Sequence, residues 1–154
     1  MRKHRHAPWD DGAESGAVDD RIRVVLECPP EKSTTIIAGV IEQAGYAVRS
    51  CEGPHARHGC ELIDDGTCVL VSEADVVVNM LGLRRDGAPV VEAVRNRRRP
   101  PAVVVEAYDR DVEEVDFDAE GVTMLESPVR TDALFAAIEA ALESRGDAGS
   151  PGTP

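Results

Sequence analysis

The sequence predicts an α/β domain in which helices cover both faces of a doubly wound parallel sheet. Short β-branched runs alternate with amphipathic stretches along the chain, a pattern typical of strands joined by crossover helices. The run from Ala74 to Met80 is almost uniformly apolar, as expected of a central parallel strand buried on both faces. Hydrophobic residues make up 42% of the chain and aromatic residues only 3%, which predicts an aliphatic core.

The first part of the domain has local signals for two strands and a helix. Residues 21–27 form a β-branched run and predict the first strand. Pro29, Pro30 and the hydroxyl cluster at residues 33–35 then provide start signals for a helix that ends at Gly45. A second strand is expected at residues 46–50. The apolar face of the helix consists of Ile36, Ile37, Val40, Ile41 and Ala44.

The second part continues the alternation. A third strand at residues 74–80 precedes a helix at residues 89–97, and further strands are expected at residues 102–105 and 122–125. The acidic run at residues 106–120 is expected to form a solvated loop that replaces or frays a helix. A last amphipathic helix is predicted at residues 131–142. The inward residues of the last helix are Leu134, Phe135, Ile138 and Leu142, and those of the helix at residues 89–97 are Val90, Val91 and Val94.

A single domain is expected over residues 21–145. Residues 1–20 and 146–154 contain Gly, Asp, Ser or Pro without an apolar period, so both tails are expected to be disordered. Trp9 lies in the first tail, where exposure to solvent is the favoured interpretation.

The charge of the chain limits its partners. A formal net charge of −12 opposes binding to nucleic acid, because phosphate contacts depend on Lys and Arg. No run of about 18 apolar residues is present, and the basic start of the chain is followed by acidic residues instead of an apolar signal core. We therefore expect a cytoplasmic protein with neither a nucleic-acid nor a membrane partner.

Three stretches carry a family resemblance. Residues Asp75–Asn79, followed by Arg85–Gly87, have the spacing of a receiver's phosphoacceptor strand and of the Asp-Gly turn beyond it. Residues Gly45–Val48 are similar to the turn after the first receiver helix, and Ser127–Pro128 with Thr131–Leu134 are similar to the last strand, its proline and the last helix. The middle of the chain thus resembles a response-regulator receiver domain, which implies a flavodoxin-like, five-stranded parallel sheet in one domain.

The resemblance also implies that the phosphorylation site is degenerate. The phosphoacceptor position falls on Asn79, whose amide cannot form an acyl phosphate, and the acidic magnesium-binding pair falls on Glu27 and Cys28. The hydroxyl position falls on Glu106 and the lysine position on Ser127, which removes the expected counter-charge for a phosphoryl group. Glu27 and Glu106 are interpreted in the first place as solvated carboxylates at a loop edge.

These changes predict a function without phosphotransfer. The chain is interpreted as a stand-alone pseudo-receiver, not an enzyme, that regulates through contact with a protein partner. Gating by the metal or thiol state of the segment from Cys51 to Cys68 is left open, as is a homodimer. The surface of the last strand and last helix is the common partner surface of receivers, which makes Arg130, Leu134 and Glu139 candidate contacts.

A cysteine and histidine segment offers a second hypothesis. Cys51, Cys60 and Cys68 with either His55 or His58 could supply a tetrahedral zinc site, and zinc is the one cofactor suggested. The favoured alternative is that the thiols pack as small apolar groups, and a Cys51–Cys60 or Cys60–Cys68 disulfide is a third. Because of several Gly and Pro residues, this segment is expected to be a loop instead of a continuous helix.

Cys28 supports a third hypothesis. It follows the first strand and precedes Ser33 and Thr34, an arrangement similar to the phosphocysteine loop in the cytoplasmic B component of sugar phosphotransferase systems. Pro29 and Pro30 remove amide donors that such a loop needs, so this enzyme hypothesis ranks below the binding module.

Overall fold

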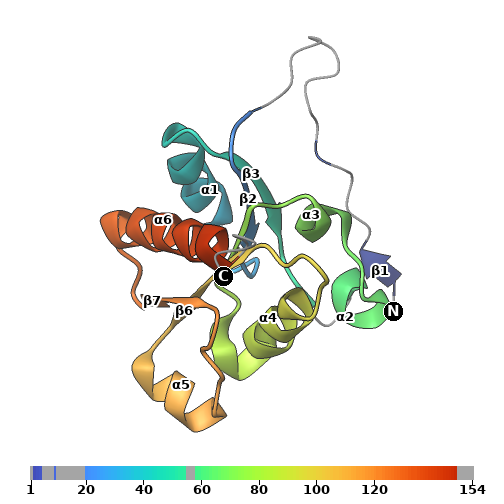
Figure 1. The fold of residues 1–154 in the computed structure, drawn as a ribbon. Helices are drawn as coiled ribbons and strands as arrows, with labels where there is room; N and C mark the ends of the chain where they lie inside the picture. Colours follow the sequence, from blue (N-terminus) through green and yellow to red (C-terminus); the bar gives the residue numbers. More distant parts are fainter. Residues whose placement is uncertain (1, 5–8, 10–19, 55–57, 149–154) are drawn as a thin grey trace, which may run out of the picture.

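A computed structural model describes residues 2–4, 9, 20–54 and 58–148. Its centre is a five-stranded parallel sheet with the strand order β3-β2-β5-β6-β7, which confirms the predicted fold (Figure 1). Because the chain runs from the inner strand β2 out to β3 and then crosses to β5, the winding direction reverses between β2 and β5. The strands are β2 (Arg23–Glu27), β3 (Ala47–Cys51), β5 (Val76–Asn79), β6 (Ala102–Ala107) and β7 (Thr123–Glu126).

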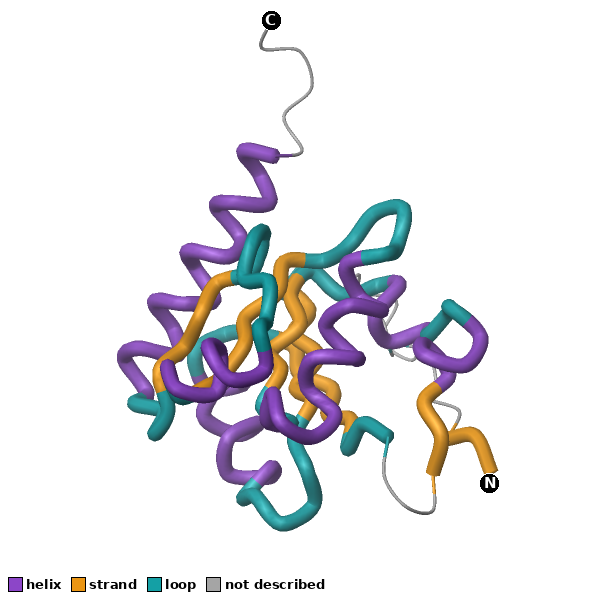
Figure 2. Tube along the Cα trace, turned by 90° about the horizontal axis from the view of Figure 1, so that it is seen from below, coloured by secondary structure: helices purple, strands orange, loops and turns teal. Residues whose placement is uncertain are grey.

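Helices cover both faces of this sheet (Figure 2). Helices α1 (Thr34–Gln43) and α6 (Thr131–Ala148) pack on one face, and α4 (Ala88–Arg95) packs on the other. The inner strands contribute side chains to the cores on both faces of the sheet, because successive side chains of a strand point to opposite faces. Val24 and Leu26 belong to the core under α1 and α6, and Val25 belongs to the core under α4.

The segment after β3 is more ordered than the loop expected from its Gly and Pro residues. It contains β4 (His58–Cys60) and two short helices, α2 (Glu61–Asp65) and α3 (Val69–Ser72). Gly66 ends α2 in the left-handed region at φ 76°, a conformation that favours glycine. The expectation of a loop is wrong here because Leu62, Leu70 and Val71 bury their side chains in the core on the α4 side of the sheet.

The acidic run between β6 and β7 is also more ordered than expected. Residues Asp109–Val115 form helix α5, so the prediction of a loop is wrong for them. Asp109 and Asp111 lie in its first turn, where a negative charge complements the helix dipole, and Val112 and Val115 pack against the core. The turn after β5, η1 (Gly82–Gly87), lies next to α5 and joins β5 to α4.

Part of the N-terminal tail is ordered, in contrast to the prediction. Strand β1 (Arg2–His4) pairs in parallel with β4, and Trp9 is only 8% exposed. The Trp9 ring packs in the core on the α4 side, and its Nε1–H donates a hydrogen bond of 3.1 Å to the Leu70 carbonyl. The guanidinium groups of Arg23 and Arg49 lie 5.6 and 5.9 Å from the ring centroid. A large apolar ring with one polar N–H is stabilised by such a site more than by water.

The C-terminal end of the domain differs from the prediction by a few residues. Helix α6 continues to Ala148, beyond both the predicted helix end at residue 142 and the predicted domain end at residue 145. Most of the first predicted tail and residues 149–154 lie outside the described residues. Within the described part of the chain, no helix is long and apolar enough to cross a membrane.

Candidate functional site

The site begins with Asn79, the last residue of β5. Its side chain is fully buried, and both polar atoms of the amide are engaged by backbone. Oδ1 accepts a hydrogen bond of 3.1 Å from the Leu81 N–H, and Nδ2 donates one of 3.3 Å to the Gly87 carbonyl. Asn79 therefore anchors the η1 turn to the end of β5, and its buried amide offers no nucleophile to solvent.

Gly87 completes this anchor by a close approach of two backbone segments. A Cβ atom at position 87 would lie 2.7 Å from the Gly82 carbonyl oxygen and 3.2 Å from Oδ1 of Asn79. Real Cβ contacts are not this short, so the turn requires glycine.

Glu27 lies beside Asn79, because the two residues are register partners in β2 and β5. It is only 3% exposed, and among the described residues its Oε1 has no hydrogen-bond partner. The interpretation of Glu27 as a solvated carboxylate is therefore wrong: the strand extends to Glu27, and the chain covers it. Burial raises the pKa of Glu27 to about 8, although a hydrogen bond with Asn79 acts in the opposite direction.

Glu106 lies at the end of β6 and is paired with a lysine that the sequence analysis did not identify. The Lys32 ammonium donates a hydrogen bond of 2.7 Å to Oε1 of Glu106 and one of 3.0 Å to the Met80 carbonyl. The Glu106 side chain is only 12% exposed, so the solvated interpretation is wrong for it as well. Lys32 does place a cation at this edge of the sheet, but Glu106 pairs with it. Lys32 is the only Lys or Arg between residues 24 and 48, and this signal could have identified it.

Ser127 and Cys28 occupy different surroundings. Ser127 follows β7 and lines a cavity of about 380 Å³ together with Lys32 and Glu106. Cys28 is fully buried under α1 and α6, and burial raises the pKa of its thiol. Because a phosphoryl donor cannot reach a fully buried sulfur, the structure provides no support for the phosphocysteine hypothesis.

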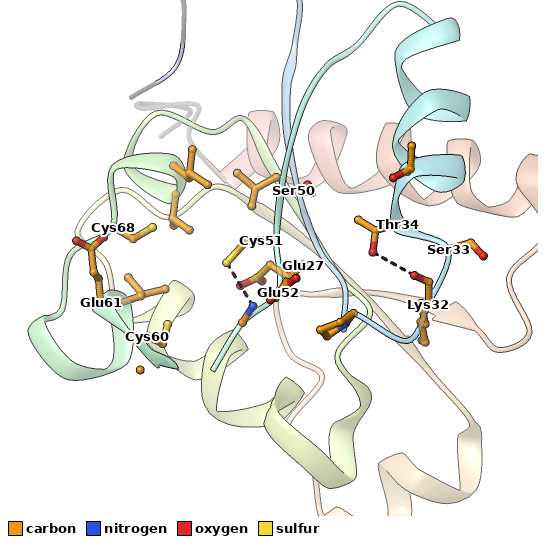
Figure 3. A pocket seen from close by; sticks show the side chains of 18 of the residues that line it. Glu27, Lys32, Ser33, Thr34, Ser50, Cys51, Glu52, Cys60, Glu61 and Cys68 are labelled. Atoms are coloured by element: carbon orange, nitrogen blue, oxygen red, sulfur yellow. Dashed lines mark hydrogen bonds between the residues drawn. The ribbon is translucent and has the colours of Figure 1, made fainter. Parts of the chain in front are cut away.

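Cys51, Cys60 and Cys68 line one cavity of about 660 Å³, and Glu27 lines it with them (Figure 3). Burial raises the pKa of the Cys51 thiol to about 12, and it also raises the pKa values of Cys60 and Cys68. All four cysteines of the chain are free thiols, without either of the disulfides considered above.

The described residues contain no group of three or more His, Cys, Asp or Glu side chains that could hold a metal ion. His55 and the side chain of His58 lie outside the described residues, so the zinc site of Cys51, Cys60 and Cys68 with a histidine stays a prediction. Elemental analysis of protein purified without a histidine tag would check it.

The predicted partner surface is in part incorrect. Arg130 and Glu139 are exposed at the start and on the outer side of α6. Leu134 is only 3% exposed and belongs to the core under this helix, because it lies on the inward stripe of α6. Leu134 is therefore not available to a partner.

The fold is that of response-regulator receiver domains. A receiver protein from Sinorhizobium medicae WSM419 matches with a TM-score of 0.59 at 17% identity, covering 82% of this chain and 98% of that chain. The signal receiver domain of an HD domain-containing protein from Pseudomonas fluorescens Pf-5 matches with a TM-score of 0.62 at 14% identity, covering 82% and 98%. That of a putative Luxo repressor protein from Vibrio parahaemolyticus matches with a TM-score of 0.57 at 18% identity, covering 83% and 95%.

At such low sequence identities, the structural similarity shows a shared fold and nothing further. No protein-family model matches the chain, and the comparison with curated proteins found no match either.

Proposed function

We propose that this chain is a pseudo-receiver: a regulatory module, not an enzyme, that accepts no phosphoryl group and acts through contact with a protein partner. The observation that carries the proposal is the state of the phosphoacceptor position. Asn79 provides an amide instead of a carboxylate, and both of its polar atoms hold the backbone of the following turn. An amide nitrogen in this state is not a nucleophile toward a phosphoryl donor.

The electrostatics of the cleft support the same proposal. A phosphoryl group carries negative charge and needs nearby cations that are free to meet it. Lys32 is held by Glu106 and by the Met80 carbonyl, and Glu106 would repel an incoming phosphate. A phosphate that drew Lys32 away from Glu106 would break a partly buried ion pair and leave the Glu106 carboxylate without its partner.

The charge of the chain favours a particular kind of partner. A net charge of −12 opposes nucleic acid and favours a protein with a basic surface, and we place this interaction in the cytoplasm. We expect the partner to bind at Arg130, which directly precedes α6, and at Glu139 on the exposed side of α6; both side chains are exposed. A homodimer is the alternative occupant, and the molar mass in solution by light scattering over a range of protein concentrations distinguishes the two.

Incubation with acetyl phosphate and Mg²⁺, followed by intact-mass spectrometry, tests the proposal. We expect no phosphoryl adduct on this chain under conditions that fully label an authentic receiver domain in the same tube. An Asn79→Gln variant is the matched control for any labelling elsewhere on the surface. Stoichiometric labelling that maps to the cleft, or that Asn79→Gln abolishes, would overturn the proposal.

A further inference from the structure

The cavity beside Glu27 has the size and walls of a ligand site. Its volume of about 660 Å³ lies within the range of roughly 300–1,000 Å³ that is usual for pockets holding small organic molecules. It lies at the carboxyl ends of β2 and β3, between the segment that starts α1 and helices α2 and α3 (Figure 3). Much of its wall is aliphatic: Val25, Ile36, Leu62, Leu70 and Val71.

Glu27 contributes an unpaired polar atom to this cavity. Buried polar atoms in folded proteins are nearly always hydrogen-bonded, because leaving one unpaired is energetically costly. Among the described residues, Oε1 of Glu27 is the buried side-chain oxygen or nitrogen without a partner. Glu27 is the register partner of Cys51 in the neighbouring strand, and both line the cavity (Figure 3). Glu27 lines the cavity, but its unpaired oxygen is covered, so a donor from a bound molecule reaches it only when the side chain turns toward the cavity.

The charges around the cavity select the sign of that molecule. Glu52 and Glu61 line it in addition to Glu27. Lys32 is the lysine at its edge, and its ammonium is bound to Glu106 and to a backbone carbonyl. Carboxylates in partly desolvated surroundings attract a cation more strongly than they would in water.

The same surroundings favour an organic cation over a metal ion. The described residues hold no group of three or more side chains with the arrangement of a metal site. A single ion would also leave most of a 660 Å³ cavity empty, whereas an apolar ligand body would bury the aliphatic wall.

We propose that this cavity binds a small organic cation, an ammonium or amidinium group on an apolar body, whose N–H groups donate to Oε1 of Glu27. The apolar body lies against the aliphatic wall formed by β2, α2 and α3. Lys32 lines the edge of this cavity, but its ammonium is held by Glu106 and makes no part of the proposed contact, so the binding does not depend on the proposed lack of phosphorylation. In a pseudo-receiver, such a ligand would replace phosphate as the input signal.

Three isosteric probes test the sign of the charge. Benzamidine, benzamide and benzoate share a planar shape and carry a positive, zero and negative charge. We expect benzamidine to produce saturable chemical-shift changes, in spectra of the ¹⁵N-labelled full chain, at residues 50–53 and 60–71. Above the Glu27 pKa of about 8, where its carboxyl is ionised, we expect benzamide and benzoate to bind at least about tenfold more weakly, because one charge-assisted hydrogen bond to a buried carboxylate is lost.

Two variants locate the binding. Glu27→Gln keeps the volume of the side chain and removes the charge that Glu27 carries above its pKa of about 8, so at such a pH the affinity for benzamidine should fall by about tenfold or more. Glu113→Gln makes the same chemical change on the exposed side of α5 and should leave the affinity unchanged. Should Glu27→Gln fail to fold, as its spectrum would show, the comparison of the three probes on the unmodified chain decides the question.

Other results would overturn the proposal. These are equal or tighter binding of benzoate, undiminished benzamidine binding by a folded Glu27→Gln variant, and no saturable binding of benzamidine up to its solubility limit. A fourth is selective binding of zinc chloride that is lost in Cys60→Ser and competes with benzamidine, which would assign the cavity to a metal. None of these outcomes depends on the acetyl phosphate experiment, so the two proposals fail separately.

Discussion

The ammonium nitrogen of Lys32 lies 2.7 Å from a carboxylate oxygen of Glu106, although 74 residues separate the two in the sequence. The pair joins the segment before α1 to the end of β6, across the carboxyl ends of β2 and β5. An internal cation and an internal anion therefore meet at the carboxyl edge of the sheet.

We expect Lys32 and Glu106 to be energetically coupled. Lys32→Met leaves a carboxylate that is only 12% exposed without its partner, so the free energy of unfolding should fall. The lysine side chain is 36% exposed and partly screened, so a double-mutant cycle with Glu106→Gln should give a coupling of about 1 kcal/mol. The exposed Arg130–Asp132 pair is the control, with an expected coupling below about 0.3 kcal/mol. Equal coupling energies for the two pairs, measured by urea denaturation, would contradict the prediction.

We expect the stability of the protein to depend on pH through Glu27. The pKa of its carboxyl is raised from 4.5 to about 8 by burial, so the folded state holds one proton more than the unfolded chain between these values. The free energy of unfolding contributed by this group is therefore fully present below pH 4.5 and is lost as the pH rises through about 8.

Urea denaturation between about pH 6 and about pH 8 measures this effect as the difference between the unmodified chain and Glu27→Gln. The unmodified chain should lose up to about 1.4 kcal/mol per pH unit more than the variant. Parallel pH profiles would show that the carboxyl is solvated. The other titratable groups around the cavity are present in both proteins and cancel in the difference: Lys32, Cys51, Glu52, Cys60, Glu61 and Cys68.

Trp9 should contribute to stability in spite of its place near the start of the chain. Trp9→Ala removes a ring that is 92% buried in the core and a hydrogen bond to Leu70, so the free energy of unfolding should fall by about 3 kcal/mol. Tyr108→Ala removes an exposed ring and should cost less than about 1 kcal/mol. Tryptophan fluorescence provides a second measurement, because Trp9 is the only tryptophan. An emission maximum in the unmodified protein equal to that in urea would show that the ring is not docked.

The η1 turn should reject a methyl group at position 87. Gly87→Ala would place its Cβ 2.7 Å from the Gly82 carbonyl oxygen, and the turn could relieve this contact only by moving away from Asn79. We expect a loss of about 2 kcal/mol in the free energy of unfolding. Gly39→Ala is the matched control, because its Cβ would meet no atom within 4 Å and a mid-helix alanine should stabilise α1 by about 0.5–1 kcal/mol. Equal thermal stability of the two variants would contradict the account of the turn.

Local patterns were sufficient to predict the architecture. The apolar runs that became β2, β5 and β6 have the length and composition of buried strands, and the stripes of α1, α4 and α6 have a helical period. Such patterns depend on residues only a few positions apart, which is why they can be recognised without a structure. They also placed Asn79 and Glu106 at strand ends, at the edge where a parallel sheet gathers its functional groups.

The chemistry of the site depends on contacts that no local pattern contains. Whether Glu27 is solvated, whether Lys32 meets Glu106 and whether Trp9 is buried are decided by segments between 52 and 74 residues apart. The free energy of a charge or a large ring depends on which atoms surround it, and these atoms come from other elements of the fold. The sequence by itself therefore predicts the sheet and its helices. The Lys32–Glu106 ion pair and the unpaired oxygen of Glu27 follow only from how those elements pack.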